Sequence, residues 1–91
     1  MDNSLFTEDL THCLYCSKKA VAQHCAFNNE ANHDEEKCRA DGLVVPVCWR
    51  HNLQLHTDMK RQHSLRIRAQ FEWERANPDG NFVKRYGRNY L

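Results

Sequence analysis

The chain has 91 residues, of which 41% are hydrophobic and 27% charged, and its formal net charge at pH 7 is +1. A chain of this size forms one domain with a thin apolar core, so a metal, disulfides or a partner chain is expected to help hold the fold. No apolar run approaches the roughly 20 residues of a membrane-spanning helix, which argues against a membrane protein. The acidic N-terminus lacks the features of a signal peptide, so we expect a cytoplasmic protein.

Cysteine and histidine are frequent for so short a chain, with five cysteines and six histidines. Thiols stay reduced in the cytosol, and an odd number of cysteines does not suit a framework of paired disulfides. The composition therefore points to a bound metal ion.

The sequence contains no repeat, low-complexity tract or linker, so residues 1–91 are expected to form a single domain. Residues 1–11 are predicted to be a flexible arm. The following segments are predicted to be a turn at 13–16, a strand at 21–27, a polar loop at 28–42 and a second strand at 43–47. Pro46 places the second strand at an edge or end of the sheet.

The C-terminal part is predicted to be helical. A first helix is expected over 49–60, which contains no Gly or Pro. Apolar and polar residues alternate over 65–74, as in a half-buried strand, but strong helix formers and the stop signal at 77–80 favour a helix. This second helix has two apolar stripes, so it is expected to be covered on both sides, which leaves a homodimer through this helix open. A short helix is expected at 81–87, so that residues 61–91 form a C-terminal helical extension.

Two pairs of metal-ligand residues stand out, Cys13-x2-Cys16 and Cys48-x2-His51, with 31 residues between them. A gap of two residues lets both side chains of a turn reach one tetrahedral ion. Four such ligands leave no open coordination position, so the pattern predicts one structural Zn²⁺ whose binding contributes to folding. Buried thiols beside a surface histidine are the alternative.

Three further potential ligands lie in or beside the predicted loop: Cys25, His33 and Cys38. Their spacing matches no compact ligand set, and cysteine is often buried for packing alone. We therefore expect packing roles for the two thiols, with a second zinc site as the less favoured alternative.

A second group of polar residues is centred on His24, which lies on the first predicted strand. Asn52 and His56 lie four residues apart on the helix that begins beside Cys48. That spacing places both side chains on one face of the helix. The sequence thus combines a histidine on a strand with an asparagine and a histidine on the following helix.

The zinc pattern, the pair Gln23-His24 and the segment from Asp41 to His56 together resemble the HNH, or ββα-metal, endonuclease superfamily. Over residues 12–91 the chain is similar to small phage and prophage HNH-like proteins. The resemblance implies a small α+β fold, with a zinc-stabilised ββα-metal core of the treble-clef type and additional C-terminal helices. It also implies a divalent-metal-dependent DNA endonuclease or nickase that acts in the cytoplasm of a bacterial host.

The same resemblance implies roles for individual residues. His24 would be the general base, and Asn52, His56 and Gln23 would hold a catalytic divalent cation such as Mg²⁺, Mn²⁺, Ni²⁺ or Zn²⁺. The family usually has Asp or His at the position of Gln23, and a neutral amide provides no charge for a hard cation. This leaves a second hypothesis: a catalytically silent zinc-binding module that binds nucleic acid or a protein partner.

Positive charge is concentrated in the second half of the chain, because residues 1–48 carry a net charge of −4 and residues 49–91 carry +5. A basic half is compatible with phosphate binding, although two oppositely charged solvated surfaces explain it as well. The residues expected to contact DNA phosphates are Lys60, Arg61, Arg66 and Arg68.

Overall fold

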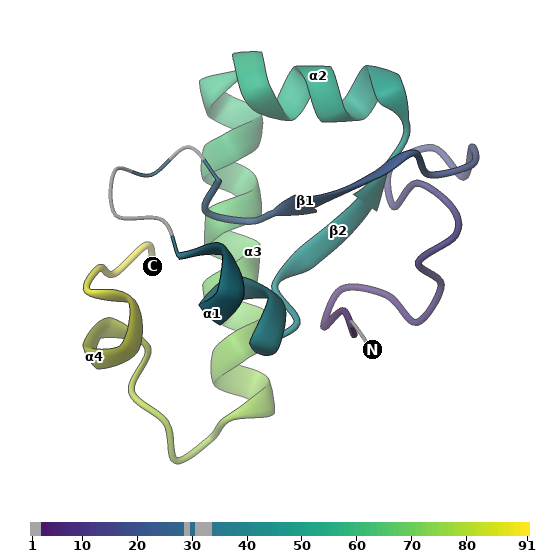
Figure 1. The fold of residues 1–91 in the computed structure, drawn as a ribbon. Coiled ribbons are helices and arrows are strands. Elements are labelled where there is room, and N and C mark those ends of the chain that lie inside the picture. The colour runs from purple at the N-terminus through teal and green to yellow at the C-terminus, as the bar shows by residue number, and fades with distance from the viewer. Residues whose placement is uncertain (1–2, 29, 31–33) are drawn as a thin grey trace.

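An antiparallel pair of strands forms the centre of the protein (Figure 1). In the computed structural model, which describes residues 3–28, 30 and 34–91, β1 (Ala22–Cys25) pairs with β2 (Val44–Val47). His24 lies opposite Val45, and Gln23 lies opposite Pro46. Both predicted strands are confirmed, although each is shorter than expected. Proline has no N–H to donate, and Pro46 is compatible with β2 because each strand of a two-stranded sheet has an outer edge that needs no hydrogen-bond partner.

Two helices follow β2 directly, α2 (Trp49–Thr57) and α3 (Met59–Ala76), and Figure 1 shows α2 lying across one end of α3. The expectation of one helix over 49–60 is corrected at Asp58, whose backbone is extended. Its carboxylate accepts hydrogen bonds from the backbone amides of Lys60 and Arg61, at 3.0 and 3.4 Å. An N-cap residue has non-helical backbone angles, so a helix that begins after Asp58 requires the preceding helix to end before it.

The longest helix, α3, confirms the helical prediction for residues 65–74. Leu65, Ala69 and Trp73 are buried along one face, as the first apolar stripe requires. Phe71 on the second stripe remains 54% exposed. Ile67, the other residue of this stripe, is half-buried, so within one chain the second stripe is less well covered than the first.

A short helix, α1 (Glu35–Ala40), occupies part of the segment that was predicted to be a polar loop. Its N-cap is Asp34, which accepts a hydrogen bond from the backbone amide of Lys37 at 3.0 Å. Glu35 and Glu36 lie in its first turn, where the helix dipole favours negative charge. The loop prediction was wrong here because a helix that buries only Cys38 has no apolar periodicity to reveal it.

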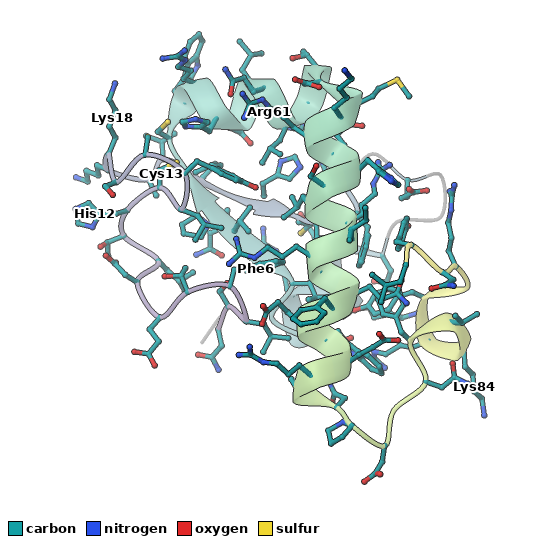
Figure 2. All side chains as sticks on the ribbon, turned by 180° about the vertical axis from the view of Figure 1, so that it is seen from behind. Phe6, His12, Cys13, Lys18, Arg61 and Lys84 are labelled. Carbon is teal, nitrogen blue, oxygen red and sulfur yellow. The ribbon has the colours of Figure 1, made fainter. Side chains whose placement is uncertain are left out.

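The N-terminal segment, expected to be a flexible arm, lies against the core at residues 4–6. Ser4 donates its hydroxyl to the backbone carbonyl of Val44 at 2.6 Å, and the amide of Leu5 donates to Gly42 at 2.8 Å. Phe6 is buried, and its ring lies 5.4 Å from the Arg68 guanidinium carbon on α3 (Figure 2). The prediction of a flexible arm over residues 1–11 did not include these contacts, because they join segments far apart in sequence.

The last helix, α4 (Phe82–Tyr86), confirms the short helix that was predicted at the C-terminus. Gly87 ends it in the left-handed conformation at φ 75°, which glycine adopts without a steric penalty. Phe82 is 1% exposed, and its ring centre lies 5.7 Å from that of Trp73 and 4.7 Å from that of Tyr86. Among the described residues, no helix has the length and apolar character required to span a membrane.

Asp41 connects the end of α1 to both C-terminal helices. Its carboxylate accepts hydrogen bonds from Arg85 and Tyr86 of α4, and from the Trp73 indole at 3.1 Å. Burial alone would raise the pKa of Asp41, but the hydrogen bonds and the charge of Arg85 outweigh it and lower the pKa below its ordinary value of 3.8. The carboxylate is therefore more stable in the folded state than in the unfolded chain.

Replacing this carboxylate should destabilise the protein in a pH-dependent way. We expect Asp41→Asn to lower the free energy of unfolding at pH 7 by about 2 kcal/mol, because hydrogen bonds to a charged group are lost. The folded-state pKa is lowered, so this contribution is present above pH 3.8 and is lost as the pH falls through the folded-state value. Urea titrations of both proteins at several pH values measure the difference, which should shrink in acid.

The matched control is Asp79→Asn, because Asp79 is exposed in the loop before α4. It should change stability by less than about 0.5 kcal/mol. An equal effect of the two substitutions would contradict the role assigned to Asp41.

Candidate functional site

The first half of the site is a tight turn before β1. An antiparallel bridge between His12 and Lys19 closes it, and the amide of Cys13 donates to the Lys18 carbonyl at 2.6 Å. Ser17 adopts a positive φ of 63° and donates its amide to the Cys13 carbonyl at 3.0 Å. The chain folds back here within a few residues, which brings Cys16 close to Cys13.

The second half is the junction between β2 and α2. Cys48 is the N-cap of α2, and His51 lies in its first turn. The amide of Leu14 in the turn donates to the Pro46 carbonyl of β2 at 2.9 Å. This hydrogen bond holds the turn against the end of the sheet, so that the two predicted ligand pairs face each other.

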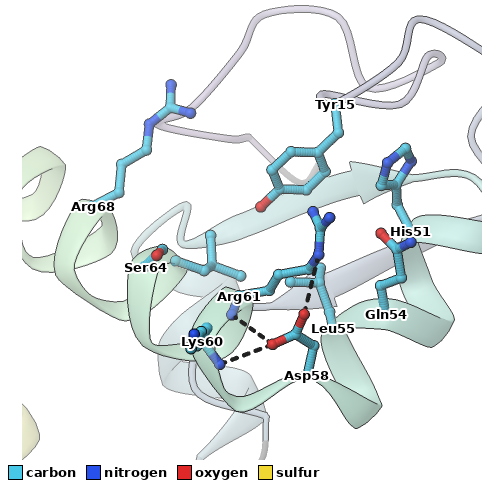
Figure 3. Close-up of a pocket in the computed structure, with 10 residues that line it drawn as sticks. Tyr15, His51, Gln54, Leu55, Asp58, Lys60, Arg61, Ser64 and Arg68 are labelled. Atoms are coloured by element: carbon cyan, nitrogen blue, oxygen red, sulfur yellow. Dashed lines mark hydrogen bonds and ion pairs between the residues drawn. The ribbon is translucent and has the colours of Figure 1, made fainter.

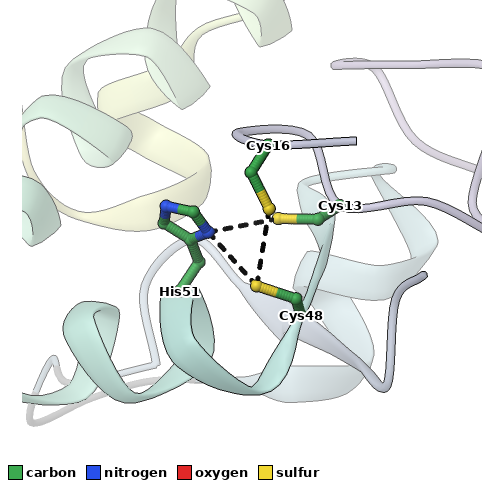
Figure 4. Close-up of side chains that lie close together, drawn as sticks. All are labelled: Cys13, Cys16, Cys48 and His51. Carbon is green, nitrogen blue, oxygen red and sulfur yellow. Dashed lines mark hydrogen bonds between the residues drawn. The ribbon is translucent and has the colours of Figure 1, made fainter. Parts of the chain in front are cut away.

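Cys13, Cys16, Cys48 and His51 form one cluster, in which all four ligand atoms lie within 4.8 Å of one another (Figure 4). The Sγ atoms of Cys16 and Cys48 are 3.6 Å apart, and His51 Nδ1 lies 3.5 Å from Cys13 Sγ and 3.2 Å from Cys48 Sγ. Tetrahedral Zn²⁺, with bonds of about 2.3 Å to sulfur and about 2.0 Å to nitrogen, requires edges of about 3.7 and 3.5 Å. The group is therefore close enough to hold a metal ion, and its dimensions suit zinc.

In comparisons with family models, curated proteins and solved structures, none matches this chain. The geometry of the cluster itself is therefore what indicates that these four residues can hold a metal ion.

The electrostatics of the cluster favour a thiolate at Cys48. The backbone amide of His51 contributes most, and with the side chains of His51, Cys16 and Cys13 it outweighs burial and lowers the pKa of the Cys48 thiol to about 6. The amide is available because Cys48 is the N-cap residue of α2, so the N–H groups of the first turn have no partner within the helix and favour negative charge. Metals bind the thiolate form, so this ligand is prepared for binding at neutral pH.

No second cluster of this kind is found among the described residues. Cys25 and Cys38 are both buried, and Cys38 donates its thiol to the Leu43 carbonyl at 3.0 Å. His33 lies outside the described residues. The packing role predicted for Cys38 thus agrees with its position on α1, where it is buried against Leu43 just before β2.

The structure brings together three of the residues that the resemblance singled out. His24 is buried in β1, and its Nδ1 lies 3.3 Å from the amide oxygen of Asn52 on α2. The rings of His24 and His56 meet edge to face, with centres 4.8 Å apart. Asn52 is half-buried and His56 is exposed, so the group opens to solvent through His56.

Gln23 is not part of this group. Its amide oxygen accepts a hydrogen bond from the guanidinium of Arg39 on α1 at 3.1 Å. Neighbouring residues of a strand point to opposite faces, so a strand that directs His24 to α2 directs Gln23 to α1. No pattern in the sequence indicated Arg39 as the partner of Gln23, because it belongs to the helix that was predicted to be a loop.

The residues predicted to contact phosphate separate into two groups. Lys60, Arg61 and Arg68 line a cavity of about 480 Å³ beside the metal cluster (Figure 3). Arg66 instead forms an ion pair with Glu30 at 3.0 Å, and its side chain is only 15% exposed. Arg68 lies seven residues after Arg61 and therefore on the same face of α3, whereas Arg66 lies on another face.

Tyr15 and Gln54 also line this cavity, and the sequence did not single them out. Tyr15 is one of the two residues between the paired cysteines, which a tight turn exposes at its tip. Gln54 lies three residues after His51 and thus on the same face of α2. The spacing of three residues from the predicted ligand His51 is the sequence signal that could have indicated Gln54.

We predict that the protein binds zinc at one site per chain and needs it to fold. Cys16→Ser should lose the bound zinc and the cooperative thermal unfolding transition, because only three ligands remain. Elemental analysis after dialysis and circular dichroism measure the two effects. The matched control is Cys25→Ala, outside the cluster, which should retain the zinc. A metal-free protein that stays folded would contradict the prediction.

Proposed function

We propose that the protein is a divalent-metal-dependent DNA endonuclease or nickase built on a zinc-stabilised ββα scaffold of the HNH type. The observation that carries the proposal is the convergence of His24, Asn52 and His56, which come from β1 and α2. In the sequence, His24 and Asn52 are 28 residues apart. Their convergence supports the roles that the resemblance implies for them.

The contact between His24 and Asn52 defines a tautomer of the histidine. An amide oxygen only accepts hydrogen bonds, so His24 Nδ1 donates to Asn52 at 3.3 Å. In a neutral imidazole the lone pair then lies on Nε2, which is the form needed to take a proton from an attacking water. Asn52 thus orients the proposed base.

Asn52 and His56 are the residues that would hold the catalytic cation. The amide oxygen of Asn52 has two lone pairs, so it can accept from His24 and still contribute one to a metal. Imidazole and amide donors without a carboxylate suit Mn²⁺, Ni²⁺ or Zn²⁺ better than Mg²⁺. A bound divalent cation would stabilise the negative charge that develops on the scissile phosphate.

One observation favours the second candidate, a zinc-binding module that binds nucleic acid or a protein without cleaving it. Gln23 is bound to Arg39 and directed away from His24. The cation would then have fewer protein ligands than the family pattern provides, and its affinity would be lower. Activity in the presence of millimolar divalent metal distinguishes the two candidates.

Nicking of supercoiled plasmid DNA tests the proposed chemistry. We expect activity with Mn²⁺ or Ni²⁺ that exceeds the activity with Mg²⁺. His24→Ala should lower the rate by about 100-fold or more, because the general base is lost. Gel separation of supercoiled and open-circular plasmid measures the rate.

The matched control is His63→Ala, since His63 is exposed on α3 and takes no part in the cluster. It should nick at the wild-type rate. Cleavage that survives His24→Ala undiminished would rule out the assigned base. A folded, zinc-loaded protein that cleaves with none of the metals would favour the binding module.

A further inference from the structure

The cavity beside the metal cluster is formed by one face of each of two helices and by the cysteine turn. His51, Gln54 and Leu55 of α2 face Leu65 and its neighbours on α3 across it. Leu55 and Leu65 are buried and form its apolar floor. Seen from behind in Figure 2, Cys13 and Arg61 lie towards the same end of the molecule. A volume of about 480 Å³ is in the range of small-ligand pockets.

The cavity lining has a net positive charge, because it contains one carboxylate, Asp58, and three basic side chains, Lys60, Arg61 and Arg68. That carboxylate is occupied: it caps α3 and also pairs with Arg61 Nε at 3.4 Å. Figure 3 shows the outer nitrogens of Arg61 directed towards the ring of Tyr15. Within the described part of the chain, Lys60 and Arg68 have no ion-pair partner. The cavity therefore offers a binding place for an anion.

Two further features point to a ligand with an aromatic ring and an N–H group. The Tyr15 ring lies 5.4 Å from the ring of His51 and is tilted by 35°, which gives the cavity an aromatic wall. The amide oxygen of Gln54 is buried and has no hydrogen-bond partner among the residues that the structure describes. A buried acceptor without a partner is unfavourable, and it is satisfied by a ligand N–H when the Gln54 amide turns into the cavity that this residue lines.

A phosphate, a planar ring and ring-borne N–H groups occur together in a nucleotide. We propose that the cavity binds one unpaired nucleotide of a DNA strand, with its phosphate at Arg61 and Lys60 and its base between Tyr15 and Gln54. The choice of DNA as the source rests on the proposed function. The nucleotide must be unpaired, because a base in a duplex is stacked and paired and cannot enter a cavity.

The position of the cavity relative to the histidine cluster follows from the helix period. His51 and Gln54 lie on one side of α2, and Asn52 and His56 lie on another. The unpaired nucleotide would therefore be held across α2 from the proposed cleavage site. This arrangement predicts a preference for DNA in which a single-stranded segment adjoins the site of cleavage.

Binding of a short fluorescent single-stranded oligonucleotide to the zinc-loaded protein, with no other divalent cation added, tests the proposal. Fluorescence anisotropy gives the Kd. We expect Arg61→Gln to raise the Kd about tenfold, because a charged hydrogen-bond donor to the phosphate is lost. Arg75→Gln is the matched control: it too removes an α3 arginine that pairs with a carboxylate three residues earlier, Glu72, but outside the cavity. Its effect should stay within about twofold.

The aromatic wall provides a second, independent pair of variants. Tyr15→Leu should raise the Kd about tenfold through the loss of base stacking, whereas Tyr15→Phe keeps the ring and should bind almost as the wild type does. A blunt duplex of the same sequence should bind more weakly than the single strand. Thermal denaturation of each variant shows that it is folded.

Equal weakening by Arg61→Gln and Arg75→Gln would overturn the proposal, since binding would then follow total charge alone. Duplex binding as tight as single-strand binding would also overturn it. The proposed function fails separately: a protein that binds the single strand through Arg61 but never nicks DNA keeps the nucleotide site and loses the nuclease. A protein that nicks DNA but binds it independently of Arg61 and Tyr15 keeps the nuclease and loses the site.

Discussion

The cluster of three thiols and one imidazole is the constraint on which the rest of the molecule depends. Each strand of the sheet has four residues, and a two-stranded sheet of that length is marginally stable by itself. The cluster joins the turn before β1 to the junction between β2 and α2, so it ties the two strands together at one end of the sheet. A metal bound there would fix the direction in which α2 leaves the sheet.

The direction of α2 determines what lies on its two sides. On one side it brings Asn52 and His56 to His24, and on the other it forms the wall of the basic cavity with His51 and Gln54. The C-terminal helices are held separately, through the Asp41 carboxylate and the packing of aromatic rings around Phe82. The metal cluster and Asp41 thus stabilise different parts of a chain whose apolar core is small.

The features that the sequence predicted are those determined by residue type and short-range spacing. The ligand set of the cluster follows from two gaps of two residues, and the shared face of Asn52 and His56 follows from the helix period. The strands and the last two helices have apolar patterns or capping residues that indicate them. The placement of His24 beside α2 was reached only through the resemblance.

The features that the sequence did not predict depend on contacts between distant segments or on a single capping residue. The helix around Cys38 buries too little to show a period, and one carboxylate at Asp58 divides the predicted helix in two. The Ser4 hydroxyl donates to Val44 of β2 and the Leu5 amide donates to Gly42 just before it, and no local sequence pattern indicates these contacts. The partner of Gln23 and the cavity at Tyr15 likewise arise from tertiary packing.

X-ray absorption spectroscopy of the zinc-loaded protein identifies the atoms that surround the metal. We expect a shell of three sulfur atoms at about 2.3 Å and one nitrogen atom at about 2.0 Å. A shell dominated by nitrogen and oxygen would place the ion at the histidine cluster instead of at the cysteines. That result would contradict the claim that the thiol cluster holds the fold together and positions α2.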